Sequence, residues 1–241
     1  MLTRAQLDST EVLSWEDLND RVAKKTYFNV RSLSLQSLCL SATHAQWLVN
    51  VLGHLGALTQ LILPDMRLGH DRVKALLESL HVATAQLGEL CLRGNHLEAR
   101  TGSHIARYLR QDCAVSLTSM DLSHNSLQNE GTAEVLRALS HIQRNLTVNL
   151  TTNEVTSLHW KHVTRCRCIT TLILDNNNLP APQRRTFVNQ NVQVSLPAQL
   201  SALHLVACNL NSLAFHELCV ALLAPCASTV SEIRLEHSLL F

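Results

Sequence analysis

The segments LGELCLRGNHL (residues 87–97) and LTSMDLSHNSL (residues 117–127) share one pattern. Apolar residues stand at the first, fourth, sixth and eleventh positions, and asparagine stands at the ninth. Eight copies fit this spacing, with strand motifs starting near residues 30, 58, 87, 117, 145, 169, 200 and 230. Four apolar positions in eight copies make 32 sites, of which only Asn145 is polar. With 46% hydrophobic residues overall, chance does not produce this regularity, and the chain is interpreted as a repeat protein.

Each copy predicts a short strand, because residues two apart, such as Leu90 and Leu92, point to the same side of a strand. Neighbouring strands are expected to form a parallel sheet. The ninth positions are Leu38, Met66, Asn95, Asn125, Asn153, Asn177, Cys208 and Ser238. A buried asparagine amide can hydrogen-bond the backbone of its own and the adjacent copy, so these four asparagines are predicted to form a structural ladder. Cys208 is a weak substitute. Leu38 and Met66 cannot pair in this way, so the first two copies are expected to be less regular.

Amphipathic helices are predicted between the strands from apolar residues at helical spacing. These stripes are Val73, Leu76, Leu77 and Leu80; Ile105, Tyr108 and Leu109; Val135, Leu136, Leu139 and Ile142; and Phe215, Leu218, Leu222 and Leu223. With a repeat of about 28 to 29 residues, residues 30–241 resemble the ribonuclease-inhibitor-like class of leucine-rich repeat proteins. The resemblance implies an α/β solenoid: a horseshoe of eight repeats with a parallel inner sheet and outer helices. It implies little about function.

The ends and two irregular copies depart from the pattern. Residues 1–29 are interpreted as an N-terminal helical cap, opened by the capping box Ser14-Trp15-Glu16-Asp17, with a partner-binding helix as the alternative. The 24-residue step from Asn153 to Asn177 leaves room for a short helical segment over residues 157–164. Prolines and a polar stretch interrupt the sixth copy, where curvature is expected to change; they are Pro180, Pro182, Pro197 and residues 189–191. The eighth strand is expected to leave an edge that associates with a partner or a second copy, unless the natural protein continues.

Composition excludes several classes of function. Twenty Lys plus Arg against nineteen Asp plus Glu give a net charge of +1, which favours neither nucleic acid nor an anionic membrane. The longest strictly apolar run, residues 218–224, is too short for a membrane span. No secretory signal opens the chain, so a cytoplasmic location is expected and the eight cysteines are interpreted as thiols.

Catalytic and metal-binding patterns are weak. His159, His162, Cys166 and Cys168 carry zinc-type ligands, but the spacing matches no common zinc motif, so no metal site is predicted. A basic island surrounds Asp175 and either receives an acidic partner or is a solvated surface; it comprises Lys161, Arg165, Arg167, Arg184 and Arg185. No phosphate-binding glycine loop, H-E-x-x-H or G-x-S-x-G motif occurs. We therefore predict no enzyme activity and no cofactor.

The outward-facing strand residues would line the concave side and are the predicted partner-binding site. They are Glu89, Arg93, Asp121, Ser123, Asn149, Asp175, His204, Arg234 and Glu236. Their mixture of acids, arginines and hydroxyls suits a protein partner better than a small molecule, so the predicted function is a non-catalytic protein-interaction scaffold. The alternatives are a merely solvated face and a GTPase-activating regulator of the Ran type, in which Arg67 or Arg93 would stabilise phosphate charge.

Overall fold

One parallel sheet runs through the molecule. The computed structural model describes residues 5–7, 11–13, 20, 23–24, 30–35, 42–83, 86–142, 144–156, 163, 166, 169–179, 199–223 and 230–238. Eight neighbouring strands pair in parallel in chain order: β3 (Ser32–Leu35), β4 (Gln60–Ile62), β5 (Glu89–Cys91), β6 (Ser119–Asp121), β7 (Leu146–Asn149), β8 (Ile169–Ile173), β9 (Ala202–His204) and β10 (Glu232–Arg234). Every strand lies inside one of the eight predicted motifs, so the repeat spacing located the sheet correctly.

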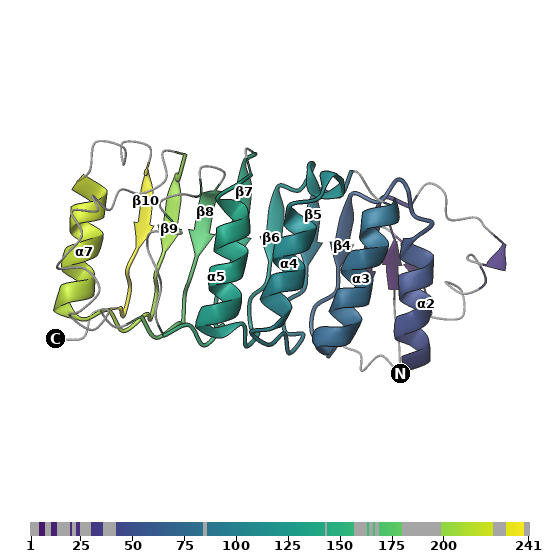
Figure 1. Cartoon of the computed structure of the whole chain (residues 1–241), viewed down its shortest axis with the longest axis horizontal. Helices are drawn as coiled ribbons and strands as arrows, with labels where there is room; N and C mark the ends of the chain where they lie inside the picture. Colours follow the sequence, from purple (N-terminus) through teal and green to yellow (C-terminus); the bar gives the residue numbers. More distant parts are fainter. Residues whose placement is uncertain are drawn as a thin grey trace.

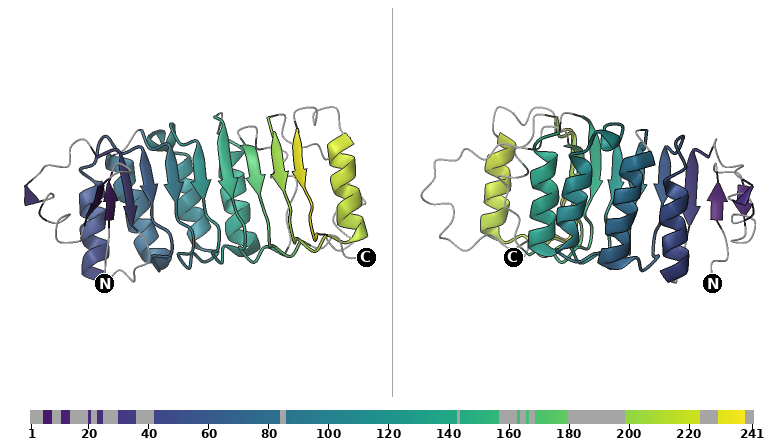
Figure 2. Two further views of the ribbon diagram at one scale, coloured as in Figure 1. Left: turned by 180° about the vertical axis from the view of Figure 1, so that it is seen from behind. Right: turned by 45° about the vertical axis from the view of Figure 1, so that its right-hand side comes forward.

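Helices connect the strands and cover one face of the sheet (Figures 1 and 2). They are α2 (Ala42–Leu52), α3 (Gly69–Ala83), α4 (Thr101–Leu109), α5 (Gln128–Leu139) and α7 (Ser212–Leu223), with a 3-10 turn η1 (Asp112–Ala114) after α4. The alternation of strand and helix confirms an α/β fold with a repeat-like arrangement. Helix α2 was not predicted, although Ala45, Leu48 and Leu52 recur at helical spacing and are buried.

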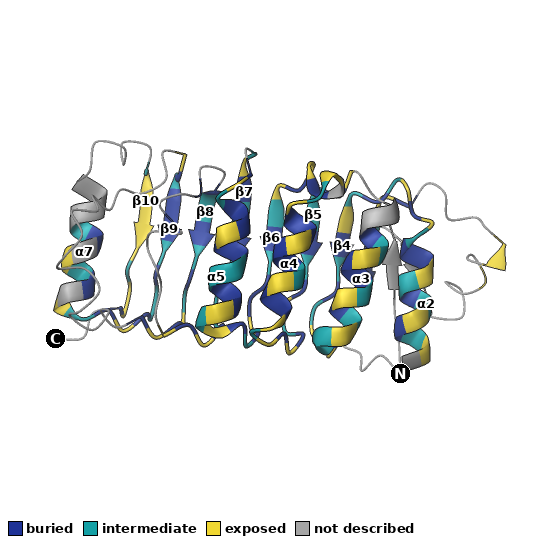
Figure 3. Ribbon diagram, in the orientation of Figure 1, coloured by how far each residue is buried: buried dark blue, intermediate teal, exposed yellow. Residues whose placement is uncertain are grey.

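The hydrophobic core lies between the sheet and the helices (Figure 3). The central strand residues that point toward the helices are Leu33, Leu61, Leu90, Met120, Val148, Leu172 and Leu203, each at most 1% exposed. The predicted stripes of α3 and α4, and that of α5 with Ile142 just beyond its end, face them and are buried. In α7, Leu218 is buried and Phe215 is partly exposed. Each unit thus buries its apolar residues against its neighbours, as a repeat must.

The N-terminal segment differs from the predicted helical cap. Strands β1 (Ala5–Leu7) and β2 (Glu11–Leu13) form an antiparallel hairpin, and β1 pairs antiparallel with β3. Main-chain pairing with β1 covers the otherwise open edge of β3, which a helix over these residues would leave unpaired, so the helical interpretation is corrected for both strands. The capping box at residues 14–17 lies outside the described residues. Just after it, the described residues Asp20 and Ala23 are helical.

The second repeat unit is more regular than predicted. Strand β4 pairs in register with both β3 and β5, and Met66 is fully buried. The main-chain N–H groups of Met66 and Leu68 donate to Asn95 Oδ1 of the next unit, at 3.1 and 3.3 Å. Its turn is therefore held from the following unit, and an apolar residue at its own ninth position is tolerated. Leu38 lies outside the described residues.

The structure also locates the short repeat step. The pairing of β7 with β8 contains a register irregularity at Leu146 and Thr147, next to the 24-residue step. Of the helix expected at residues 157–164, only Val163 is described, and it is helical and buried. The prolines of the sixth copy lie in residues 180–198, outside the described part. No described helix is both long and apolar enough to span a membrane.

Candidate functional site: the open face of the sheet

The sheet face away from the described helices is the candidate site and is called here the open face (Figure 2). Strand alternation places two in-register rows on it. The first row is Ser32, Gln60, Glu89, Ser119, Thr147, Thr171, Ala202 and Glu232. The second row is Ser34, Ile62, Cys91, Asp121, Asn149, Ile173, His204 and Arg234. Residues that follow the strands extend the face, among them Arg93, Asp175 and Glu236.

At the centre of the face, Asp121 and Asn149 are register partners on β6 and β7. Each side chain also fixes the start of its own turn, because Asp121 Oδ1 accepts the Ser123 N–H at 2.9 Å and Asn149 Oδ1 accepts the Thr151 N–H at 3.0 Å. Both side chains are half-buried. One oxygen of each group is therefore engaged in the fold.

Asp175 repeats this arrangement across two units. Its Oδ1 accepts the N–H of Val206, which lies in the following unit, at 2.7 Å. Within the described residues neither Asp121 nor Asp175 forms an ion pair, although both are partly exposed. The middle of the open face therefore carries two oriented carboxylates surrounded by hydroxyl and amide groups.

The C-terminal end of the face carries a charged cluster. Glu232 Oε1 lies 2.5 Å from Arg234 Nε and 3.6 Å from His204 Nε2. His204 is 14% exposed at its side chain, whereas the other two are largely accessible. Because the Arg234 pair is exposed, it contributes little stability and its charges remain available to a partner.

Cys91 is the thiol of the second row. Burial raises its pKa to about 11, and the nearby carboxylates of Asp121 and Glu89 add to this against opposing effects from Arg93. Its Sγ lies 3.9 Å from Asp121 Oδ2, a weak S–H donor contact. A thiol held protonated in this way is a poor nucleophile at neutral pH.

The predicted site residues occupy unequal environments. Arg93, Arg234 and Glu236 are exposed, while Glu89, Asp121, Asn149, Asp175 and His204 are partly exposed. Ser123 is only 2% exposed, so its side chain is withdrawn from the surface and its inclusion in the binding site is corrected. Glu89 accepts a hydrogen bond from Gln60 Nε2 at 3.2 Å, which adds Gln60 of the second unit to the face.

The four asparagines form the predicted hydrogen-bonded ladder. Asn125 accepts from the N–H groups of Asn95 and Leu97 and donates to the carbonyls of Leu92, Leu122 and Ser123, over 2.8 to 3.1 Å. Asn95, Asn153 and Asn177 make equivalent contacts. All four are buried and link consecutive units. The ladder therefore fixes where each strand ends and how its open-face side chains are spaced.

Neither a family model nor a curated protein matches this chain. The argument for function therefore depends on the geometry of the site.

Two ordered features were not predicted. At the second motif position, hydroxyl side chains donate to main-chain carbonyls of the preceding unit: Thr59 to Arg31, Thr118 to Gly88, Ser201 to Thr170 and Ser231 to Ser201, over 2.9 to 3.2 Å. The recurrence of Thr and Ser at this position was the available signal.

The second feature is Glu154. Its carboxylate accepts hydrogen bonds from Ser126 Oγ and Gln128 Nε2, and these hydrogen bonds hold the pKa of Glu154 below the ordinary value.

Metal ligands do not converge on the described part of the chain, where no group of three His, Cys, Asp or Glu side chains has suitable geometry. Of the zinc-type residues, only Cys166 is described; it is buried and its Sγ lies 3.1 Å from the Leu136 carbonyl. His159, His162 and Cys168 lie outside the described residues. The basic island also lies outside them, apart from the neighbouring Asp175.

Proposed function

We propose that the chain is a leucine-rich repeat protein of the ribonuclease-inhibitor-like class, and that its open face is a concave surface that binds partner proteins. The molecule is then a non-catalytic scaffold. Eight in-register strands, helices on one side and the buried asparagine ladder support the family assignment, because the class combines these three features.

One observation carries the functional part of the proposal. Polar side chains stand in register along the open face, and the hydrogen bonds of Asp121, Asn149 and Asp175 hold them in fixed orientations. A preorganised surface loses little conformational entropy when it binds, which favours association with a protein surface. The two carboxylates without ion pairs in the described residues supply its central polar contacts.

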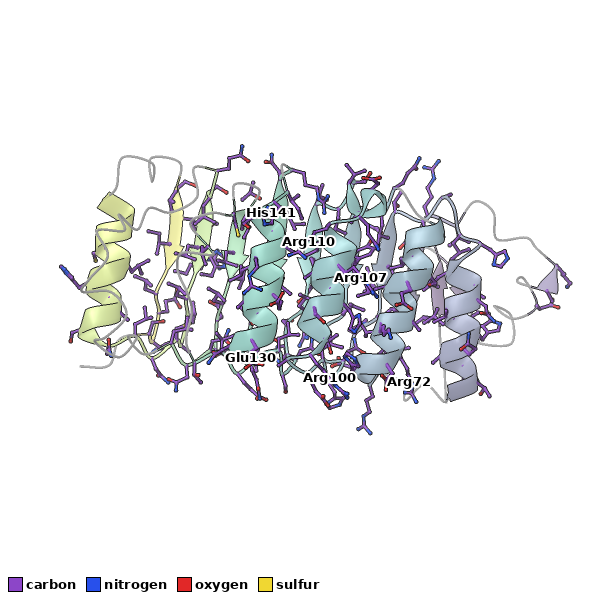
Figure 4. All side chains as sticks on the ribbon, viewed as in Figure 1. Arg72, Arg100, Arg107, Arg110, Glu130 and His141 are labelled. Atoms are coloured by element: carbon purple, nitrogen blue, oxygen red, sulfur yellow. The ribbon has the colours of Figure 1, made fainter. Side chains whose placement is uncertain are left out.

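The test is affinity purification of the tagged full chain after crosslinking in its own cells. The double variant Asp121→Arg/Asp175→Arg reverses both central carboxylates, and Glu130→Arg reverses a single carboxylate on the helix side as a control (Figure 4). Specific partners are expected to bind the natural chain and the control but not the double variant. Circular dichroism establishes that each variant is folded. Partners that remain bound to the folded double variant would contradict the proposal.

The alternative, a GTPase-activating regulator, is distinguished from a scaffold by measuring how fast a small GTPase hydrolyses GTP with and without this protein. Arg67 and Arg93 are both exposed. Stimulation that disappears in Arg67→Ala or Arg93→Ala would replace the scaffold proposal, whereas an unchanged rate is expected of a scaffold.

The edge of β10 is proposed as a second place of association. Ile233 is 38% exposed, whereas Leu203, its register partner on β9, is fully buried. Strand β10 has a strand neighbour on one side only among the described residues. An exposed apolar residue at a sheet edge favours pairing with another strand. Light scattering is expected to show association that Ile233→Lys removes, and a monomeric natural chain would contradict it.

A further inference from the structure

A separate pocket lies on the helix side of the molecule, at the C-terminal ends of α4 and α5. Its volume is about 270 Å³, and its wall includes Arg110, Arg144 and His141 beside a single acid, Asp112. Figure 4 shows Arg110 and His141 at this end of the two helices, away from Arg100 and Glu130 at the other end. Pockets for drug-sized ligands span roughly 300 to 1,000 Å³, so this one is sized for amino-acid side chains rather than for a large cofactor.

Arg110 differs from the other arginines of the helix side. Arg100 pairs with Glu98 at 2.9 Å, Arg107 pairs with Glu78 at 2.7 Å, and Arg137 forms an ion pair with Glu134. The Arg110 side chain has neither an ion pair nor a hydrogen bond within the described residues, although it is exposed beside Asp112. A guanidinium presents a planar fork of donors that matches a carboxylate in bidentate geometry.

The pocket also has an apolar wall. Val115 is 60% exposed, and it and Ile233 are the large hydrophobic side chains that stand exposed in the described part of the chain. Ile142, also in the wall, is 8% exposed. The favourable interaction of a cation with a helix C-terminus accounts for Arg110 but not for an exposed valine beside it. A ligand that combines negative charge with an aliphatic group accounts for both.

We propose that this pocket binds an acidic side chain of a partner polypeptide, with the carboxylate on Arg110 and an adjacent aliphatic residue on Val115. Arg144 adds positive potential around the carboxylate. The apolar wall disfavours a phosphate dianion or a nucleic-acid backbone, because neither gains anything from Val115, and Asp112 repels a dianion more strongly than a singly charged carboxylate. This site is independent of the open face, because its residues follow the helices and not the strands.

The test uses the full chain and three fluorescein-labelled peptides. Fluorescence anisotropy is expected to give a dissociation constant in the range of about 0.1 to 1 mM for GSLELG, as befits a short flexible ligand. The peptides GSLQLG, without the carboxylate, and GSSESG, without the leucines, are each expected to bind at least about tenfold more weakly. Inorganic phosphate at a concentration equal to the dissociation constant of GSLELG is expected not to displace that peptide.

Variants assign the binding to the pocket. Arg110→Glu is expected to weaken binding of GSLELG by at least about tenfold, as is Val115→Ser. Arg100→Glu makes the same charge reversal at the other end of α4 and is expected to leave it unchanged, as is Asp121→Arg/Asp175→Arg on the open face. Binding of GSLQLG equal to that of GSLELG, no binding of GSLELG, displacement by phosphate, or full binding by folded Arg110→Glu would each overturn the proposal.

Discussion

The repeat units with asparagine at the ninth motif position and the two units after them have the same turn geometry, although their side chains differ. Cys208 and Ser238 occupy the positions of Asn95, Asn125, Asn153 and Asn177, and both are buried. Cys208 Sγ lies 3.2 Å from the Leu174 carbonyl, and Ser238 Oγ donates to the Leu205 carbonyl. These contacts reproduce the donor half of the asparagine amide.

The acceptor half is replaced only in part by the main chain, because Ser238 Oγ still accepts the N–H of Cys208 at 3.3 Å. The N–H groups of Leu68, Leu97, Leu127 and Val155 each donate to the amide Oδ1 of an asparagine in the next unit. The equivalent N–H groups of Leu179 and Leu210 donate instead to the main-chain carbonyls of Cys208 and Ser238, at 2.8 and 2.5 Å. A buried N–H group must find an acceptor, and the backbone supplies one where the thiol does not. The comparison shows that the turn, more than the asparagine, is the invariant part of the unit.

The largest expected effect comes from removing an amide. Asn125→Leu removes the side-chain partner of the N–H groups of Asn95 and Leu97 and of the Leu92 carbonyl, while the Leu122 and Ser123 carbonyls still accept from Asn153 Nδ2 and the Gly94 N–H. We expect the free energy of unfolding to fall by about 4 kcal/mol, because each unsatisfied buried group costs roughly 1–3 kcal/mol before relaxation. Urea denaturation measures this. The control Asn178→Leu changes an exposed amide and is expected to cost less than about 1 kcal/mol. Equal losses in both variants would show that the ladder is dispensable.

The second effect concerns the close contact between two asparagine units. A Cβ at Gly102 would lie 2.4 Å from the Gly131 carbonyl oxygen, and one at Gly131 would lie 2.7 Å from that of Ala99. Gly102→Ala is expected to destabilise the fold by about 2–3 kcal/mol because backbone must move to admit the methyl group. Gly53→Ala, whose Cβ would meet its nearest atom at 3.4 Å, is the control and should cost about 1 kcal/mol or less. Thermal unfolding of both variants is the measurement, and an unaffected Gly102→Ala would refute the close packing of these units.

The third change converts a thiol unit into an amide unit. Cys208→Asn would supply an Oδ1 acceptor and retain donors for the Leu174 and Val206 carbonyls. We expect a gain of about 1 kcal/mol in the free energy of unfolding, the net worth of one added hydrogen bond. Cys208→Ala removes both contacts and should be less stable than the natural chain. A higher urea midpoint for Cys208→Ala than for Cys208→Asn would mean that the turns of the C-terminal units do not accommodate an asparagine amide at this position.

The smallest effect is the pH dependence of the helix side of the asparagine units. Burial lowers the pKa of His104 below its ordinary value of 6.5, with further contributions from the neighbouring charges of His70, Arg107 and Lys74. The folded chain then binds fewer protons at this position than the unfolded chain, so stability is present above about pH 6.5 and declines as pH falls toward the lower folded pKa.

His104→Gln removes that group and is expected to flatten the pH dependence of the urea midpoint between about pH 7 and about pH 5. An identical profile for the variant and the natural chain would contradict the assignment. Arg137→Gln on the neighbouring helix is the control. It removes a charged side chain that pairs with Glu134 and leaves His104 in place.

Periodicity predicted most of the sheet and the buried stripes of α3, α4 and α5, because burial on one side imposes a regular sequence of apolar residues. The hairpin of β1 and β2 escaped prediction because its pairing partner, β3, is distant in sequence. The turns also carried no recognisable signal. Asp65, His124, Thr152, Asn176, Ala207 and His237 all adopt φ between 52° and 57°, and of the turn residues at this motif position only Gly94 is glycine.

The candidate site was predicted in outline for the same reason. Strand alternation identified the outward positions, and eight of the nine chosen residues are partly or fully exposed. It could not show that Ser123 is buried at the turn or that Gln60 reaches Glu89 on the next strand, because these depend on how adjacent units stack.

The sequence by itself determined the number of repeat units, the position of each parallel strand and which of its faces is buried, because these follow from a local pattern of apolar residues. Only the tertiary structure decided which main-chain groups replace the amide at Cys208 and Ser238, where Arg110, His141 and Val115 come together, and what pairs with β3. Those outcomes depend on contacts between residues far apart in the chain, and packing geometry selects among them after the local pattern has been satisfied.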